Sequence, residues 1–295
     1  MAGRFGSVLT AMVTPFDAEG ALDLDAAVSL ARWLEANGND GLVVAGTTGE
    51  APTLTDQEHL DLIAAVADAV TIPVVAGTGS NDTAHAIEMT AKASGLGIAG
   101  CLVVTPYYNR PSQAGLEGHF KAVAAATSLP VVLYDIPIRT GRKASTDLLL
   151  RLARDVTNIV GVKDAAGNPA ESAVLLARAP SGFELYSGDD AMTLPLLAVG
   201  AVGVIGVATH WSGVEHGEMI SAFEKGDVAG ARETNARLLE SFAFETSDDT
   251  PNPIPTKAMM RVLGHQVGQC RPPLGPAPAG TEERARQVID NLRRV

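Results

Sequence analysis

Cysteine is scarce in this 295-residue chain, and the scarcity limits the chemistry and the folds open to it. The two cysteines, Cys101 and Cys270, form neither a disulfide framework nor a metal-binding motif. Cys101 lies in the strand-like run GCLVVTP, where a packed thiol is the simplest interpretation. A disulfide-stabilised secreted fold and a cysteine-held metal site are therefore both disfavoured.

Basic residues and long apolar runs are also in short supply. The chain has 22 Lys and Arg against 34 Asp and Glu, a formal net charge of −12, which argues against nucleic acid or an anionic membrane surface as a partner. No apolar run approaches the roughly 20 residues of a membrane span. Residues 1–16 lack the apolar segment and cleavage site of a signal peptide. We therefore expect a cytoplasmic protein that binds neither nucleic acid nor membranes.

What the chain does contain is a repeated alternation of two kinds of segment. Short runs rich in Val and Ile alternate with longer segments of helical period. The strand-like runs are 7–16, 41–46, 73–79, 100–106, 130–137, 159–165, 183–189 and 203–209. Several helical segments open with a capping residue: Thr55 (with Glu58 completing a capping box), Ser145, and Asn168 before Pro169. Eight strand–helix units are therefore expected.

Strands that are apolar on both faces and alternate with helices indicate a parallel sheet. Eight such units predict an α/β fold of the (β/α)₈ TIM-barrel type, which needs about 250 residues. An open doubly wound sheet is the alternative, but the first strand ends in TPFDAEG and not in a glycine-rich dinucleotide turn. We expect a catalytic barrel over residues 1–224 and a C-terminal helical bundle over 225–295, with residues 246–255 as a proline-rich connector.

Barrel enzymes form their active sites at the C-terminal ends of the strands. Lys163 ends the sixth run, IVGVKDA, although a lysine is rarely fully buried unless it is paired or neutralised. A snorkelling lysine is the simpler alternative. The other strand ends carry Thr47, Thr48, Tyr107, Tyr108, Tyr134, Arg139, Asp189 and Asp190. Hydroxyls, an arginine and a lysine thus converge on one end of the predicted barrel.

This set suits imine chemistry. A lysine amine condenses with a ketone, and the protonated imine then withdraws electrons from the neighbouring carbon. Burial lowers the pKa of Lys163 and so favours the neutral amine that attacks. Tyrosine and threonine hydroxyls relay protons without adding charge. The Thr47–Thr48–Gly49 turn offers backbone N–H groups to a substrate carboxylate, and Arg139 offers a bidentate partner to a second one.

The chain resembles the dihydrodipicolinate synthase family, within the pyruvate-dependent class I aldolases that also include N-acetylneuraminate lyase. The resemblance covers nearly the whole chain, and its motifs are specific when taken together. They are GTTGE (46–50), GTGSNDT (77–83), TPYYNRPSQ (105–113), YDIPIRTG (134–141), VGVKDAAG (160–167), YSGDD (186–190) and NPIPTK (252–257).

The resemblance implies a metal-independent lyase without a cofactor, which condenses pyruvate with L-aspartate 4-semialdehyde in lysine and diaminopimelate biosynthesis. It assigns the Schiff base to Lys163, and the proton relay to Tyr134, Thr48 and, from a neighbouring subunit, Tyr108. It implies a homotetramer built as a dimer of dimers. Binding roles fall to Thr47, Thr48 and Gly49 (pyruvate carboxylate), Arg139 (aldehyde carboxylate), and Gly188 and the Ile205 carbonyl (pocket lining).

Some family members are inhibited by L-lysine at a subunit interface. The resemblance gives the candidate regulatory residues as Ala51, His59, Asn81, His85 and Tyr107. His85 stands where a glutamate is expected, and Asp56 stands where a histidine is frequent. Because the lost carboxylate would pair with the ammonium group of the effector, we expect weak or absent inhibition.

Other functions remain open. A lyase for N-acetylneuraminate or keto-deoxy sugar acids would share the same chemistry, although the threonine pair and Arg139 resemble the synthase branch. A metal-dependent or phosphate-binding aldolase is a second alternative, but the HWSGVEH stretch (210–216) is a weak ligand set and the GAVGVIG glycines (200–206) suit a helix-to-strand turn. A binding protein that has lost the chemistry is the third.

Overall fold

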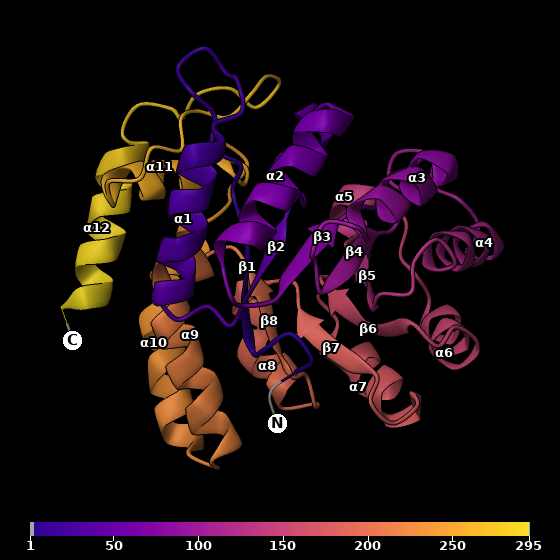
Figure 1. Cartoon of the computed structure of the whole chain (residues 1–295). Helices are drawn as coiled ribbons and strands as arrows, with labels where there is room; N and C mark the ends of the chain where they lie inside the picture. The colour runs from indigo at the N-terminus through magenta and orange to yellow at the C-terminus, as the bar shows by residue number, and fades with distance from the viewer. Residues whose placement is uncertain (1–2, 295) are drawn as a thin grey trace.

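The computed structural model describes residues 3–294, and its eight parallel strands close into one barrel (Figure 1). Each strand pairs with its successor, and β8 pairs with β1 through Val8 and Val204. The strands are β1 (Val8–Ala11), β2 (Gly41–Val44), β3 (Val74–Gly77), β4 (Gly100–Val104), β5 (Val131–Asp135), β6 (Ile159–Asp164), β7 (Glu184–Ser187) and β8 (Gly203–Gly206). The predicted (β/α)₈ fold is confirmed.

Helices surround the barrel and begin where the sequence carries capping signals. Thr55 and Glu58 form the predicted capping box at the start of the helix Asp56–Ala69, while Ser145 caps the helix Thr146–Asp155 and Asn168 caps the helix Pro169–Arg178. The helices are α1 (Leu24–Ala36), α2 (Asp56–Ala69), α3 (Thr83–Ala93), α4 (Gln113–Ala124), α5 (Pro137–Thr140), α6 (Thr146–Asp155), α7 (Pro169–Arg178), α8 (Thr193–Leu197), α9 (Thr209–Glu224), α10 (Val228–Phe244), α11 (Ile254–Val262) and α12 (Thr281–Arg293). Two 3₁₀ turns are η1 (Ala51–Thr53) and η2 (Asp190–Met192).

The alternation of side chains along each strand produces two apolar layers. One layer fills the barrel interior and contains Leu9, Val43, Val75, Leu102, Val132, Tyr134, Tyr186 and Ile205. The other lies between the strands and the helices and includes Leu42, Val44, Val103, Leu133 and Leu185. Because successive residues of a strand point to opposite faces, both faces of the sheet are buried, as in other parallel sheets.

Strand register places the candidate lysine between two tyrosines. Lys163 of β6 pairs with Tyr134 of β5 on one side and with Tyr186 of β7 on the other. All three side chains are buried. Since Tyr134 and Tyr186 belong to the interior layer, Lys163 shares the same level of the barrel.

The C-terminal helices lie against one side of the barrel, drawn in orange and yellow in Figure 1. Helices α10, α11 and α12 share an apolar cluster with α9, to which Trp211, Met219, Leu238, Met259 and Val288 belong. Helix α10 begins at Val228, just after the expected boundary at residue 224. The helical tail is thus packed onto the barrel through the last barrel helix.

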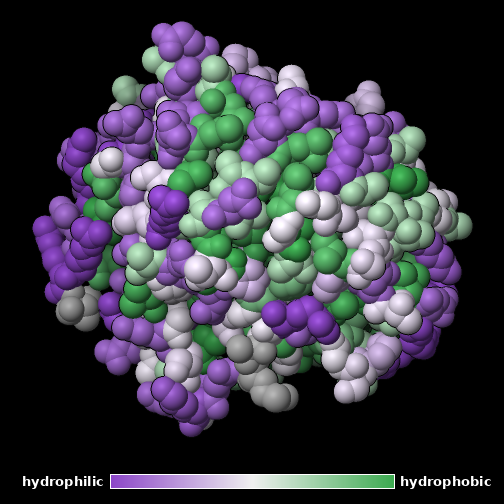
Figure 2. All heavy atoms as spheres, viewed as in Figure 1, coloured by the Kyte–Doolittle hydropathy of each residue, from purple (hydrophilic) through white to green (hydrophobic). Residues whose placement is uncertain are grey.

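The surface in Figure 2 mixes hydrophilic and hydrophobic residues, and hydrophilic residues dominate its left edge, where α12 lies in Figure 1. Within residues 3–294, no helix is both long enough and apolar enough to cross a bilayer. The cytoplasmic location expected from the sequence stays a prediction.

Candidate active site

A cavity of about 570 Å³ lies at the C-terminal end of the barrel and brings six of the predicted residues together. They are Thr47, Thr48, Tyr134, Arg139, Lys163 and Gly188. The remaining wall comes from residues that follow β5, β6, β7 and β8, from Phe242 and Glu245 near the end of α10, and from the segment 246–252 that follows it. The site therefore combines barrel loops with the connector to the helical tail.

Lys163 is the central residue of this cavity. Its side chain is 4% exposed, and its Nζ lies 4.2 Å from the centroid of the Tyr134 ring. Burial lowers the pKa of Lys163 to about 8, against the opposing effect of the Asp190 and Glu245 carboxyl groups. Gly188 makes room for the lysine stem, since a Cβ there would lie 2.9 Å from Cγ and 3.0 Å from Cε of Lys163.

Tyr134 presents its phenol beside Thr47. Burial raises the pKa of Tyr134, while the Arg139 guanidinium and a hydrogen bond with the Thr47 side chain act in the opposite direction. The phenol therefore keeps its proton at neutral pH and remains able to donate or accept one transiently. The family resemblance gives the relay hydroxyl to Thr48, whereas the threonine whose side chain acts to lower the pKa of the phenol is Thr47.

Thr48 is held by a residue from the far end of the chain. Its Oγ1 accepts a hydrogen bond of 3.0 Å from Nδ2 of Asn252. Thr48 is buried, and its neighbour Glu50 binds Lys257 at 2.6 Å between Oε1 and Nζ. Residues of the NPIPTK motif thus fix two positions of the GTTGE loop.

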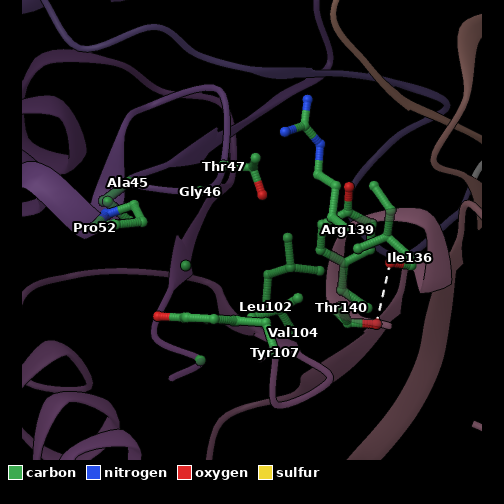
Figure 3. A pocket seen from close by; sticks show the side chains of 14 residues that line it. Ala45, Gly46, Thr47, Pro52, Leu102, Val104, Tyr107, Ile136, Arg139 and Thr140 are labelled. Atoms are coloured by element: carbon green, nitrogen blue, oxygen red, sulfur yellow. Dashed lines mark hydrogen bonds between the residues drawn. The ribbon is translucent and has the colours of Figure 1, made fainter. Parts of the chain in front are cut away.

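Arg139 lies at the cavity mouth on the short helix α5. Proline starts this helix at position 137, and Gly141 ends it in the left-handed conformation at φ 68°. Arg139 is solvent-exposed and also lines an adjoining apolar pocket of about 230 Å³. Figure 3 shows Thr47, Leu102, Val104 and Tyr107 around this pocket.

Three predicted residues are not brought to the cavity wall. Tyr108 is 90% exposed on the loop after β4, with a positive φ of 69°. Ile205 is buried in β8, and the cavity is lined instead by Val207, two residues later. Gly49 is buried, and its carbonyl accepts a hydrogen bond from Thr14. Within a single chain, therefore, neither Tyr108 nor Gly49 nor Ile205 lines the cavity around Lys163.

Of the five candidate regulatory residues, two line a pocket and the other three lie outside its wall. Ala51 and Tyr107 line the adjoining apolar pocket. His59 is buried, with Nε2 2.7 Å from the Gly77 carbonyl oxygen, whereas Nε2 of His85 lies 3.7 Å from Oδ1 of Asp56 near the surface. The carbonyl of Asn81 accepts a hydrogen bond from Asn109.

Among the cavity residues to which sequence reasoning gave no role, Asn252 and Glu245 make polar contacts with neighbouring loops. Asn252 stands in a motif that pointed to the family but carried no assigned role. Glu245 precedes the connector and carried no signal, since a single glutamate near the end of an expected helix is unremarkable. No group of three or more His, Cys, Asp or Glu side chains among residues 3–294 is arranged to hold a metal ion.

Comparisons with known proteins agree with this geometry. The sequence model of the dihydrodipicolinate synthetase family matches residues 4–292. A 4-hydroxy-tetrahydrodipicolinate synthase of Acidothermus cellulolyticus is 52% identical over 287 residues, covering 96% of this chain and 91% of the relative. Two crystal structures are similar: a dihydrodipicolinate synthase of Bacillus anthracis (TM-score 0.94, 40% identity, 98% of each chain) and one of Cyanidioschyzon merolae with lysine bound (TM-score 0.96, 43% identity, 99% and 100%).

Proposed function

The chain belongs to the dihydrodipicolinate synthetase family, and from this premise we propose that it condenses pyruvate with L-aspartate 4-semialdehyde to 4-hydroxy-tetrahydrodipicolinate. The observation that carries the proposal is the buried Lys163 amine, 4.2 Å from the Tyr134 ring in a cavity large enough for both substrates. With its pKa lowered to about 8, a substantial fraction of this amine is neutral near physiological pH.

The reaction follows from that amine. Nζ of Lys163 attacks the ketone carbon of pyruvate, and loss of water gives a protonated imine. Removal of a methyl proton gives an enamine, whose carbon attacks the aldehyde carbon of the second substrate. The amino group of that substrate then attacks the imine carbon, which closes the ring and releases Lys163. The overall reaction joins the two substrates and releases one water.

Proton transfers need a hydroxyl chain beside the imine. We assign this role to Tyr134 and Thr47, in place of Thr48, because Thr47 lines the cavity with Tyr134 and acts to lower the pKa of its phenol, while the Thr48 hydroxyl accepts from Asn252. Thr48, with the backbone N–H groups of the Thr47–Thr48 turn, is left to bind the pyruvate carboxylate, and Gly49, which does not line the cavity, is given no role. Ile205, expected to line the pocket, is given no role, because Val207 stands at the wall instead.

Tyr108 completes the relay from a neighbouring subunit in this proposal. Tyr108 and Ile138 are each 90% exposed, and Ile138 lies at the cavity wall. Exposed large apolar side chains beside a site favour burial against a second copy of the chain. A homotetramer arranged as a dimer of dimers provides that contact.

Borohydride reduction in the presence of pyruvate tests the function. We expect mass spectrometry to find a 1-carboxyethyl group on the peptide that contains Lys163, and none in Lys163→Ala. Lys143→Ala is the matched control, since Lys143 is half-buried in ion pairs with Asp135 and Glu171 outside the cavity. Absence of the adduct from the wild-type protein would refute the proposal. Competing aldehydes, including N-acetylmannosamine, then identify the second substrate.

A further inference from the structure

Two carboxyl groups lie side by side near the reactive lysine, and the proposed mechanism does not use them. Oδ2 of Asp190 accepts the backbone N–H of Val207 at 2.8 Å, and Oε2 of Glu245 accepts the next N–H, that of Ala208, at 3.0 Å. Adjacent amides at the end of β8 thus bring together one carboxyl from η2 and one from the end of α10. Because the two amides are consecutive, the two carboxyl groups lie beside each other, and burial together with the charge of Asp190 raises the pKa of Glu245.

Two carboxyl groups placed on consecutive amides are most stable with one proton between them, because one can then donate to the other, whereas ionised carboxylates only accept. Burial strengthens this requirement: Asp190 is 1% exposed and Glu245 is 8% exposed, so two negative charges in contact would repel strongly. The pair therefore carries one negative charge and one proton.

The surroundings assign the proton to Glu245. Asp190 has a second neighbour, His216, whose Nε2 lies 3.4 Å from Oδ1. Because Nδ1 of this ring donates to the Ser212 carbonyl at 2.8 Å, it is the imidazolium form of His216, protonated on both nitrogens, that stabilises the Asp190 carboxylate. Glu245 has the Ala208 amide and, nearby, the destabilising carboxylate of Asp189. His210 also faces Asp190 electrostatically, but its ring is engaged by the Val207 carbonyl and the Val13 amide.

The backbone of β8 is shaped to admit this pair. A Cβ on Gly206 would lie 2.5 Å from Oδ1 of Asp190, so a larger residue there would displace the carboxylate. Glu245 lines the same cavity as Lys163, whereas Asp190 is buried outside the cavity wall. Asp190 and Glu245 favour the protonated form of Lys163, whereas the Arg139 guanidinium disfavours it.

We propose that Glu245 is a positioning residue for the imine reaction: as the protonated member of the pair, it donates to Asp190 and keeps a single negative charge near Lys163. That charge compensates the protonated imine, which forms in a place shielded from water. A second charge would hold the free amine protonated and slow its attack, whereas no charge would leave the iminium uncompensated. This inference rests on the proposed function, since it concerns the same lysine.

The test compares Glu245→Gln with the double variant Asp190→Asn/Glu245→Gln. The single variant keeps a neutral hydrogen-bond donor beside Asp190. The pH at which pyruvate-dependent borohydride trapping is half-maximal (the midpoint) should therefore move by less than about 0.3 pH units. The double variant removes the charge, so the midpoint should fall by roughly one pH unit, with a raised KM for pyruvate. Asp190→Asn alone is less informative, because Glu245 can then ionise in its place.

Infrared spectroscopy supplies a readout independent of activity. At pH 8 the wild-type protein should show the carbonyl band of a buried, protonated carboxylic acid, and Glu245→Gln should lose it. Circular dichroism checks that each variant is folded; if the double variant is not, the infrared band alone decides. The inference is overturned if the band is absent, if Glu245→Gln shifts the midpoint as far as the double variant does, or if a folded double variant leaves the midpoint unchanged. A wild-type protein that traps no pyruvate refutes the proposed function, while the band still reports on the pair.

Discussion

The side-chain amide of Asn252 donates a hydrogen bond to the hydroxyl of Thr48, joining residues 204 positions apart in the chain. A few residues further on, Lys257 and Glu50 form a fully buried ion pair, and the Arg271 backbone N–H donates to the same glutamate at 2.9 Å. Contacts from the C-terminal segment therefore fix the position of the GTTGE loop (46–50), which would bind the pyruvate carboxylate. The tail is part of the active-site scaffold and not merely an appendage.

Replacing Asn252 with alanine should free the Thr48 hydroxyl and loosen the carboxylate-binding turn. We expect the KM for pyruvate to rise about tenfold, equivalent to about 1.4 kcal/mol of lost binding. Steady-state kinetics measure this, with Asn291→Ala on the exposed face of α12 as the control. An unchanged KM in a folded Asn252→Ala protein would show that the turn holds its shape without this hydrogen bond.

Arg139 should be needed for the reaction with the aldehyde and not for imine formation with pyruvate. The guanidinium stands at the cavity mouth, where it can pair with the carboxylate of the incoming aldehyde. Arg139→Ala should lower kcat/KM for L-aspartate 4-semialdehyde by roughly 100-fold, as expected for loss of a bidentate charged pair.

Borohydride trapping of pyruvate by the same variant should stay within a few-fold of wild type. Arg154→Ala, an exposed arginine in the last turn of α6, serves as the control. Equal losses in trapping and in aldehyde turnover would mean that Arg139 supports the imine itself.

The barrel and the position of Lys163 were predictable because both depend on local patterns. Apolar runs mark strands, capping residues mark helix starts, and residues at the ends of parallel strands must meet. The strand pattern could not predict whether Thr47 or Thr48 serves the proton relay. Both residues lie in the same turn, and the sequence does not show which of the two side chains points toward Tyr134. Glu245 reaches the site from the end of α10 and Asn252 from the connector that follows, and both positions depend on how the tail packs against α9.

Asp135 should make the stability of the protein depend on pH. Burial raises the pKa of this carboxyl to about 6, from 3.8, although the Ala144 N–H and Lys143 partly offset the effect. The folded state therefore binds the proton more tightly than the unfolded state, and stability falls as pH rises from about 4 to about 6. Above that range, the ionised carboxylate costs stability.

Asp135→Asn removes this cost while keeping the acceptor for the Ala144 N–H. We expect a gain of about 1–2 kcal/mol at pH 8, or a few degrees in Tm, and a smaller gain at pH 5. Thermal unfolding at both values measures it, with the exposed Asp290→Asn as the reference. A destabilised variant at pH 8 would mean that the Lys143 ion pair outweighs the burial of the charge.

L-Lysine should inhibit the protein weakly or not at all. An effector ammonium needs a free carboxylate, and the one offered by Asp56 already faces the imidazole of His85 at 3.7 Å. His59 is likewise turned inward to the Gly77 carbonyl. His85→Glu adds a carboxylate at this position and should increase sensitivity to lysine by about tenfold. Initial rates over a lysine titration measure both effects, with Lys92→Ala on the exposed face of α3 as the control. Strong inhibition of the wild-type protein at sub-millimolar lysine would show that Asp56 serves the effector despite its contact with His85.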